Sequence, residues 1–137
     1  MFNKKNVMKN IYQITEDVSF KSGGVRTVLV NLDDYINSNN THKSTILTNF
    51  KEKNDPYLVF KPSSLKIWNY STNYQKYLNS KISEIDVLHL HGVFMHPQYT
   101  SSKLALQNNV PFIISPHGML EPWHLNDVFT IVFSFLV

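Results

Sequence analysis

The sequence predicts one α/β domain, a mostly parallel sheet flanked by helices. Its 137 residues are the length of a single domain. Apolar runs of strand length alternate with segments of helical periodicity, as in βαβ units. All four glycines lie in three short segments, Gly23-Gly24, Gly92 and Gly118, and each segment follows a run predicted to be a buried strand. Because glycine lets a backbone approach a ligand closely, these segments predict a ligand site along one edge of the sheet.

The N-terminal half contains three predicted strands, over residues 7–14, 44–47 and 65–68. Between the first two, apolar residues recur with the period of an amphipathic helix, which Asn39-Asn40 ends. The apolar face of that helix is predicted to be Val25, Val28, Leu29, Leu32, Tyr35 and Ile36. Residues 49–56 are polar and are predicted to form a loop.

The second half predicts two more helices and two more strands. Thr72 and Gln75 have the spacing of a capping box, which begins a helix that continues to Ile82. Its apolar face is predicted to be Tyr74, Tyr77, Leu78 and Ile82. Residues 87–90 read as a strand, and Pro97 suits the first position of the helix that follows. That helix contains residues 104–106 and ends at Asn108-Asn109, before a last strand over residues 112–114.

Composition narrows the classes of partner. The net charge of +3 comes from twelve scattered lysines and the single Arg26, a pattern typical of a solvated surface, so no nucleic-acid partner is predicted. The absence of cysteine excludes disulfides and thiolate metal sites. The N-terminus does not read as a signal peptide, and the longest apolar run, residues 128–137, is shorter than the roughly 20 residues of a bilayer span. A cytoplasmic protein without a transmembrane segment is predicted, and peripheral membrane association stays open.

Three loops are candidate functional sites. In the first, Gly23 and Gly24 precede a predicted helix, whose free N–H groups favour a phosphate or another anion. The segment lacks the third glycine of a dinucleotide fingerprint and the Lys-Ser/Thr end of a P-loop, so a simple tight turn is an equal alternative.

The second loop follows His89 and His91, which are two residues apart in a strand and therefore point to the same face. Five of the six histidines lie between positions 89 and 124. A metal site completed by Asp86 or Glu121 is one alternative. The other is that His89 packs as a hydrogen-bonded core residue while His91, before Gly92, reaches the cleft.

The third loop, residues 115–123, carries the most specific pattern, Ser-Pro-His-Gly-Met-Leu-Glu-Pro-Trp. His117 stands between a proline and a glycine at the end of a strand, an arrangement that favours a functional role for a titratable side chain. Glu121 suits the charge at a helix N-terminus, and Trp123 is interpreted as a packing residue.

Together these segments resemble the N-terminal, acceptor-side half of family 4 glycosyltransferases, retaining enzymes of the GT-B fold. The resemblance covers residues 11–123. It rests on the Gly-Gly-Val loop, on Asp-Val-Leu-His-Leu-His-Gly at 86–92, and above all on Val110-Pro111 followed by the motif at 115–123. It implies a single Rossmann-like domain over residues 1–124 and transfer of a sugar from a nucleotide sugar to a glycan or lipid-linked acceptor.

The resemblance also implies roles for individual residues. Gly23 and Gly24 would approach the donor diphosphate and the acceptor, and His117 would be the catalytic residue beside the transferred sugar. His91, Phe94 and Met119 would lie near the acceptor, and Gly92 and Gly118 would belong to the same substrate-binding loops. No metal and no cofactor is expected, because the nucleotide sugar is itself a substrate, and no protein base is assigned.

The chain departs from the family in two ways. The second domain, which binds the nucleotide, is missing, so we expect the chain to be inactive alone. Residues 125–137 are apolar where the family has a polar helix, which predicts a truncation or frameshift product or a tail buried against a partner. The alternatives are a non-catalytic subunit that docks onto a separate donor-binding domain and a hydrolase that uses a metal bound by the histidines.

Overall fold

The computed structural model describes residues 7–63 and 68–122, which form an α/β fold around one sheet of five parallel strands. The strand order is β3-β2-β1-β4-β5, and every neighbouring pair is parallel. The predicted Rossmann-like architecture is therefore confirmed. The strands are β1 (Lys9–Ile14), β2 (His42–Thr48), β3 (Leu58–Val59), β4 (Val87–His91) and β5 (Phe112–Ser115).

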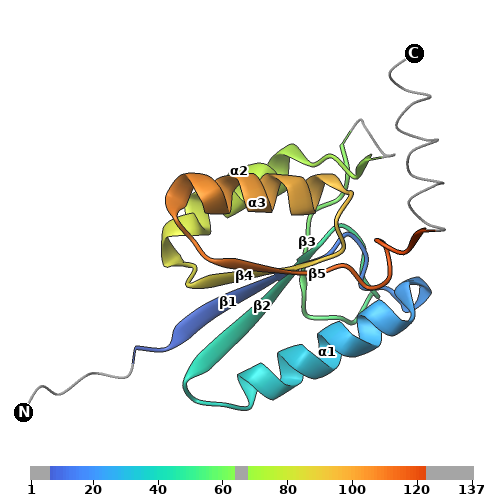
Figure 1. The fold of residues 1–137 in the computed structure, drawn as a ribbon. Helices are drawn as coiled ribbons and strands as arrows, with labels where there is room; N and C mark the ends of the chain where they lie inside the picture. The colour runs from blue at the N-terminus through green and yellow to red at the C-terminus, as the bar shows by residue number, and fades with distance from the viewer. Residues whose placement is uncertain (1–6, 64–67, 123–137) are drawn as a thin grey trace, which may run out of the picture.

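Helices cover both faces of the sheet (Figure 1), with α1 (Gly24–Asn37) on one face and α2 (Thr72–Lys81) and α3 (His96–Asn108) on the other. Two short 3-10 helices, η1 (Phe20–Ser22) and η3 (Ile82–Glu84), precede α1 and follow α2. None of the helices in the described part of the chain is long and apolar enough to cross a membrane. The larger core lies under α2 and α3 and the smaller one under α1, where Leu29 packs with Val18 and Ile46.

The boundaries of α3 follow the sequence signals. Pro97 stands in the first turn, where its missing N–H costs no helical hydrogen bond. Asn109 caps the other end in the left-handed conformation with φ of 55°, and its N–H donates to the carbonyl of Ala105.

Two sequence predictions for the first half need correction. The third strand is Leu58–Val59, which pairs with Leu47 and Thr48 at the end of β2. The predicted range falls mostly on residues 64–67, outside the described part of the chain. The apolar face of α1 is narrower than predicted, because Val28 and Tyr35 are 48% and 74% exposed. Of the α-helices in the described residues, only α1 covers this face of the sheet (Figure 1), and it buries one stripe of its residues.

The predicted capping box at the start of α2 is offset by one residue. Ser71 is the N-cap, and its hydroxyl accepts a hydrogen bond from the N–H of Tyr74. Thr72 is consequently the first helical residue. The predicted apolar face of α2 is nearly correct, since Tyr74, Leu78 and Ile82 are buried and Tyr77 is half-buried.

The topology places a switch point at the carboxyl end of the sheet. The chain leaves β1 towards α1 on one face, whereas it leaves β4, the neighbour of β1, towards α3 on the opposite face (Figure 1). The carboxyl ends of two such neighbouring strands are where open α/β sheets bind their ligands.

Candidate functional site

Three histidines lie together at the carboxyl end of β4 and β5. His89 and His91 lie on one face of β4, as their spacing predicts, with ring centroids 4.1 Å apart. The ring of His117, from the loop after β5, lies nearly parallel to that of His91, with centroids 5.2 Å apart. His91 is 1% exposed, whereas His89 and His117 are half-buried. The predicted packing role of His89 agrees with its contact, because its Nε2 shares a 2.7 Å hydrogen bond with the hydroxyl of Ser115.

A buried chain of hydrogen bonds fixes the protonation pattern of this group. Gln13 on β1 donates through Nε2 to Ser44, so its Oε1 faces Nε2 of His91 at 3.1 Å and can only accept. Nε2 of His91 therefore carries a proton, and in the neutral ring Nδ1 is an acceptor. The 2.9 Å contact between this Nδ1 and Nε2 of His117 then requires His117 to donate. His91 thus orients the imidazole of His117.

The backbone of the third loop holds its histidine in an unusual conformation. His117 has φ of 51° and Gly118 has φ of 81°, both in the left-handed region. Few residues with a side chain adopt this region, and the cost is of order 1–3 kcal/mol. The N–H groups of Met119 and Glu121 donate to Pro116 and Gly118 in successive turns. The loop therefore holds the His117 ring against His91 instead of in an extended strand.

Gly92 sits where four segments meet. A Cβ atom at this position would lie 3.1 Å from Nε2 of Gln98, 3.3 Å from Cε of Met119 and 3.4 Å from Oε2 of Glu16. Gln98 on α3 also donates to Glu16 and to the carbonyl of His91. The structure thus places His91, Gly92, His117 and Met119 next to one another, with Gly118 in the same loop as His117. The prediction that His91 reaches the cleft is wrong, because its side chain is buried between Gln13 and His117.

The Gly23-Gly24 segment lies at the start of α1 and does not directly follow its strand. Residues 15–22, including η1, separate it from β1, which corrects the sequence prediction. A Cβ atom on either glycine would meet nothing within 4 Å, so this backbone is open to an approaching molecule. No side chain from the described residues caps the N-terminus of α1.

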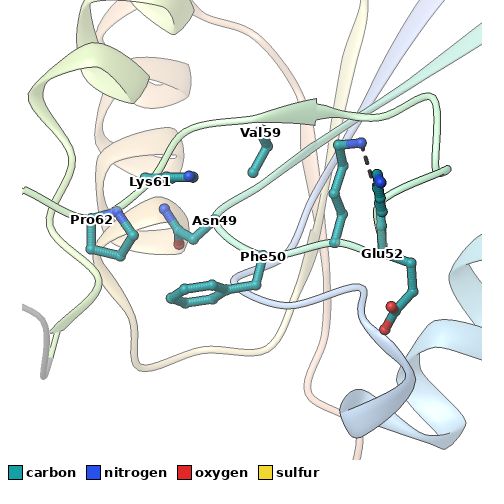
Figure 2. A pocket seen from close by; sticks show the side chains of 8 residues that line it. Asn49, Phe50, Glu52, Val59, Lys61 and Pro62 are labelled. Atoms are coloured by element: carbon teal, nitrogen blue, oxygen red, sulfur yellow. Dashed lines mark hydrogen bonds between the residues drawn. The ribbon is translucent and has the colours of Figure 1, made fainter.

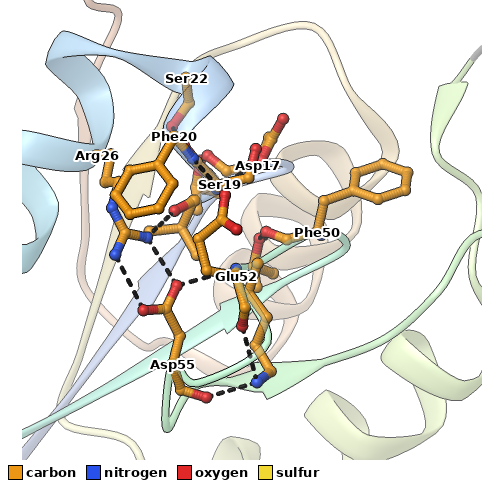
Figure 3. Close-up of polar contacts among 12 residues, drawn as sticks. Asp17, Ser19, Phe20, Ser22, Arg26, Phe50, Glu52 and Asp55 are labelled. Atoms are coloured by element: carbon orange, nitrogen blue, oxygen red, sulfur yellow. Dashed lines mark hydrogen bonds and ion pairs between the residues drawn. The ribbon is translucent and has the colours of Figure 1, made fainter.

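Polar contacts of Arg26 hold the start of α1 against the loop after β2 (Figure 3). Its guanidinium binds both carboxylate oxygens of Asp55, at 2.7 and 2.9 Å, and also donates to the carbonyl of Val18. The hydrogen bond from Arg26 lowers the pKa of the Asp55 carboxyl. The N–H of Phe20 donates to Glu52 at 2.8 Å, so η1 is tied to the same loop.

The carboxylates that would complete a metal site with the histidines do not lie beside them. Asp86 lies before the first residue of β4 and pairs with Lys9, at the opposite end of the strand from His91. Glu121 is exposed. Within residues 7–63 and 68–122, no group of three His, Asp or Glu side chains could hold a metal ion. Asp86 is therefore excluded as a partner of His91.

The sequence analysis missed several polar residues of the site. Gln13 and Gln98 are 0% and 3% exposed, and Glu16 joins Gln98 beside Gly92. One sequence signal could have revealed Gln13, because it stands between the apolar residues Tyr12 and Ile14 of a buried strand. Glutamine is rarely buried without a hydrogen-bond partner. The interpretations of Trp123 and of the tail at 125–137 concern residues outside the described part of the chain.

Burial of His91 predicts a specific loss of stability in acid. Burial, reinforced by the neighbouring His89 and His117, lowers the pKa of His91 from 6.5 to about 3. The unfolded chain therefore binds a proton at His91 below pH 6.5 while the folded protein does not, and stability falls as the pH decreases from 6.5 towards 3. At about pH 5, His91 alone should cost about 2 kcal/mol of unfolding free energy relative to about pH 7.

Urea denaturation of the protein and of His91→Gln at several pH values measures this contribution. Glutamine keeps a hydrogen-bonding amide at the position but cannot titrate. The variant should therefore lose less stability than the unmodified protein over the same pH interval. Equal losses in the two proteins would show that His91 is not the group responsible.

Comparisons of the chain with protein-family models, with curated proteins and with solved structures found no match. The candidate function therefore depends on the geometry of the site and on the sequence pattern alone.

Proposed function

We propose that this chain is the acceptor-side domain of a retaining, nucleotide-sugar-dependent glycosyltransferase. The proposal rests on one observation: His91, Gly92, His117 and Met119 lie together at the carboxyl edge of the sheet, next to the point where the strand order reverses. The acceptor would be a glycan or a lipid-linked sugar, and no cofactor takes part. The nucleotide would be held by a second domain, on the same polypeptide or on a partner, and the 137 residues alone would not transfer sugar.

The site offers groups suited to such a transfer. His117 presents an imidazole whose Nε2–H is directed to His91, which leaves Nδ1 available to a sugar hydroxyl. The uncapped N–H groups at the start of α1, next to Gly23 and Gly24, can stabilise negative charge on a departing diphosphate. Together these groups would bind and orient the sugar from one side and the diphosphate from the other.

The test joins the chain to the donor-binding domain of a retaining GT-B enzyme and measures transfer of labelled sugar. The joined protein should transfer sugar, and the chain alone should not. His117→Asn should lower kcat by about 10²–10³-fold, because it removes a group aimed at the reacting sugar. Asparagine tolerates a positive φ, so the loop conformation is kept.

The matched control replaces a residue near the other end of α1 from Gly23-Gly24. Tyr35→Ala, on the exposed side of α1, should leave kcat unchanged. Transfer by His117→Asn at the unmodified rate would refute the assigned role of His117. Transfer by the chain alone would refute its proposed dependence on a second domain.

A further inference from the structure

A cavity of about 520 Å³ opens at the carboxyl ends of β2 and β3 (Figure 2). Its wall is mostly apolar, with the ring of Phe50 and the side chains of Val59 and Pro62. A cavity of this size, largely apolar with a few polar groups, is typical of a small-molecule site. The sequence analysis assigned residues 49–56 only to a polar loop.

Three lysines and one glutamate line this cavity, so its charge is positive. Lys51 is held in place, since its ammonium group donates to the carbonyl of Asp55 at 2.5 Å. Lys53 and Lys61 are exposed and form no ion pair within the described residues. Glu52 accepts from the N–H of Phe20, and Figure 2 shows its carboxylate turned away from Lys61 and Asn49. An anion at Lys61 would therefore meet an ammonium group that the Glu52 carboxylate does not face (Figure 2).

The side chain of Asn49, which lines this cavity, has a hydrogen-bond acceptor that a ligand could pair with. Its side chain is 1% exposed, and its Nδ2 donates to the carbonyl of Phe60 at 2.7 Å. Its Oδ1 is buried and meets no donor in the part of the chain that the structure describes. Because a buried acceptor without a partner costs about 1–3 kcal/mol, a ligand hydroxyl placed here would gain that hydrogen bond.

The cavity adjoins the histidine site. The N–H groups of Asn49 and Phe50 both donate to the carbonyl of Glu16 at 3.2 Å. The carboxylate of the same Glu16 accepts from Gln98 and lies beside Gly92. Glu16 thus connects the loop that lines the cavity with Gly92, which follows His91.

We propose that this cavity binds an anionic sugar, one that carries both hydroxyl groups and a carboxylate or phosphate. Lys53 and Lys61 bind the anionic group, Asn49 accepts a hydrogen bond from a hydroxyl, and Phe50 packs against the apolar face of the ring. That this sugar is the acceptor of a transfer reaction rests on the proposed function, whereas its binding does not.

The test is titration of the ¹⁵N-labelled chain with glucuronate, glucose 6-phosphate, glucose and inorganic phosphate, followed by NMR. The two anionic sugars should shift the signals of Asn49, Phe50 and Lys61 and bind on the order of tenfold more tightly than glucose, since each exposed lysine contributes about 0.2–1 kcal/mol. Their affinity should fall as salt is added. Inorganic phosphate should bind more weakly than glucose 6-phosphate, because it lacks the ring.

The double variant Lys53→Met/Lys61→Met should lose the preference for anionic sugars and bind them as weakly as glucose. Lys76→Met/Lys103→Met, which removes the same charge from exposed positions on α2 and α3, should keep the preference. Equal affinity for glucose and glucuronate, equal affinity for phosphate and glucose 6-phosphate, or an equal loss in both double variants would overturn the proposal. Because the titration measures binding alone, it is independent of the transfer assay with His117→Asn.

Discussion

Tyr74→Ala should cost about 3–5 kcal/mol of unfolding free energy, the range for removing a buried aromatic side chain. Tyr74 is 0% exposed at the centre of the core beneath α2 and α3. Its ring meets Phe60 edge-on at 5.6 Å, and its hydroxyl shares a 2.5 Å hydrogen bond with Ser101 on α3. The substitution leaves a cavity and also removes one of the two partners of the buried Ser101 hydroxyl, which still donates to the carbonyl of Pro97. The loss is comparable with the whole stability of many small domains.

Urea denaturation followed by circular dichroism measures this effect as a shift of the midpoint. Tyr35→Ala is the matched control, because the same atoms are removed from a side chain that is 74% exposed. It should change the unfolding free energy by less than about 0.5 kcal/mol. Similar losses in the two variants would contradict the packing described for Tyr74.

Gly92→Ala should destabilise the protein by about 2–4 kcal/mol, since it combines backbone strain with overpacking. The φ of 93° at Gly92 is one that residues with a side chain rarely adopt. The added methyl group would also press against Gln98, Met119 and Glu16, at 3.1 to 3.4 Å. Relief of these contacts requires the ends of the three side chains to shift, including the Gln98 amide that donates to the carbonyl of His91. We therefore expect the contact between His91 and His117 to change as well.

Chemical denaturation gives the change in stability, and NMR signals of the histidine rings report the geometry of the site. Gly24→Ala is the control, because a Cβ atom there meets nothing within 4 Å. Gly24 begins α1, where alanine fits the backbone, so the variant should be neutral or more stable by up to about 1 kcal/mol. A Gly92→Ala protein with unchanged stability would show that the loop is not packed as described.

The sequence predicted the repeating units of the fold better than the details of its first half. Single residues were sufficient to predict the ends of a helix where a residue type strongly prefers one backbone conformation. Pro97 and Asn109 mark the two ends of α3 in this way. They failed for β3, because Leu58 and Val59 are both 38% exposed and form a strand only by pairing with the end of β2. They also overestimated the buried face of α1, because periodicity does not reveal how many helices share a face.

The candidate site was likewise predicted only in part. His-x-His spacing correctly placed His89 and His91 on one face, since side chains alternate along a strand. Spacing did not reveal that Asp86 and His91 lie at opposite ends of β4, because that depends on where the strand begins. The buried partner Gln13 is 78 positions from His91 in sequence, so no local pattern could connect the two residues.

The sequence by itself determined an α/β domain, the places where its strands end, and the histidines and glycines found at those ends, because periodicity and backbone preference are local properties. Only the tertiary structure decided the strand order and the hydrogen-bond chain from Ser44 through Gln13 to His91 and His117. It also formed the lysine-lined cavity around Asn49. These features depend on contacts between distant segments, which are set by which strands pair and by which face each helix covers.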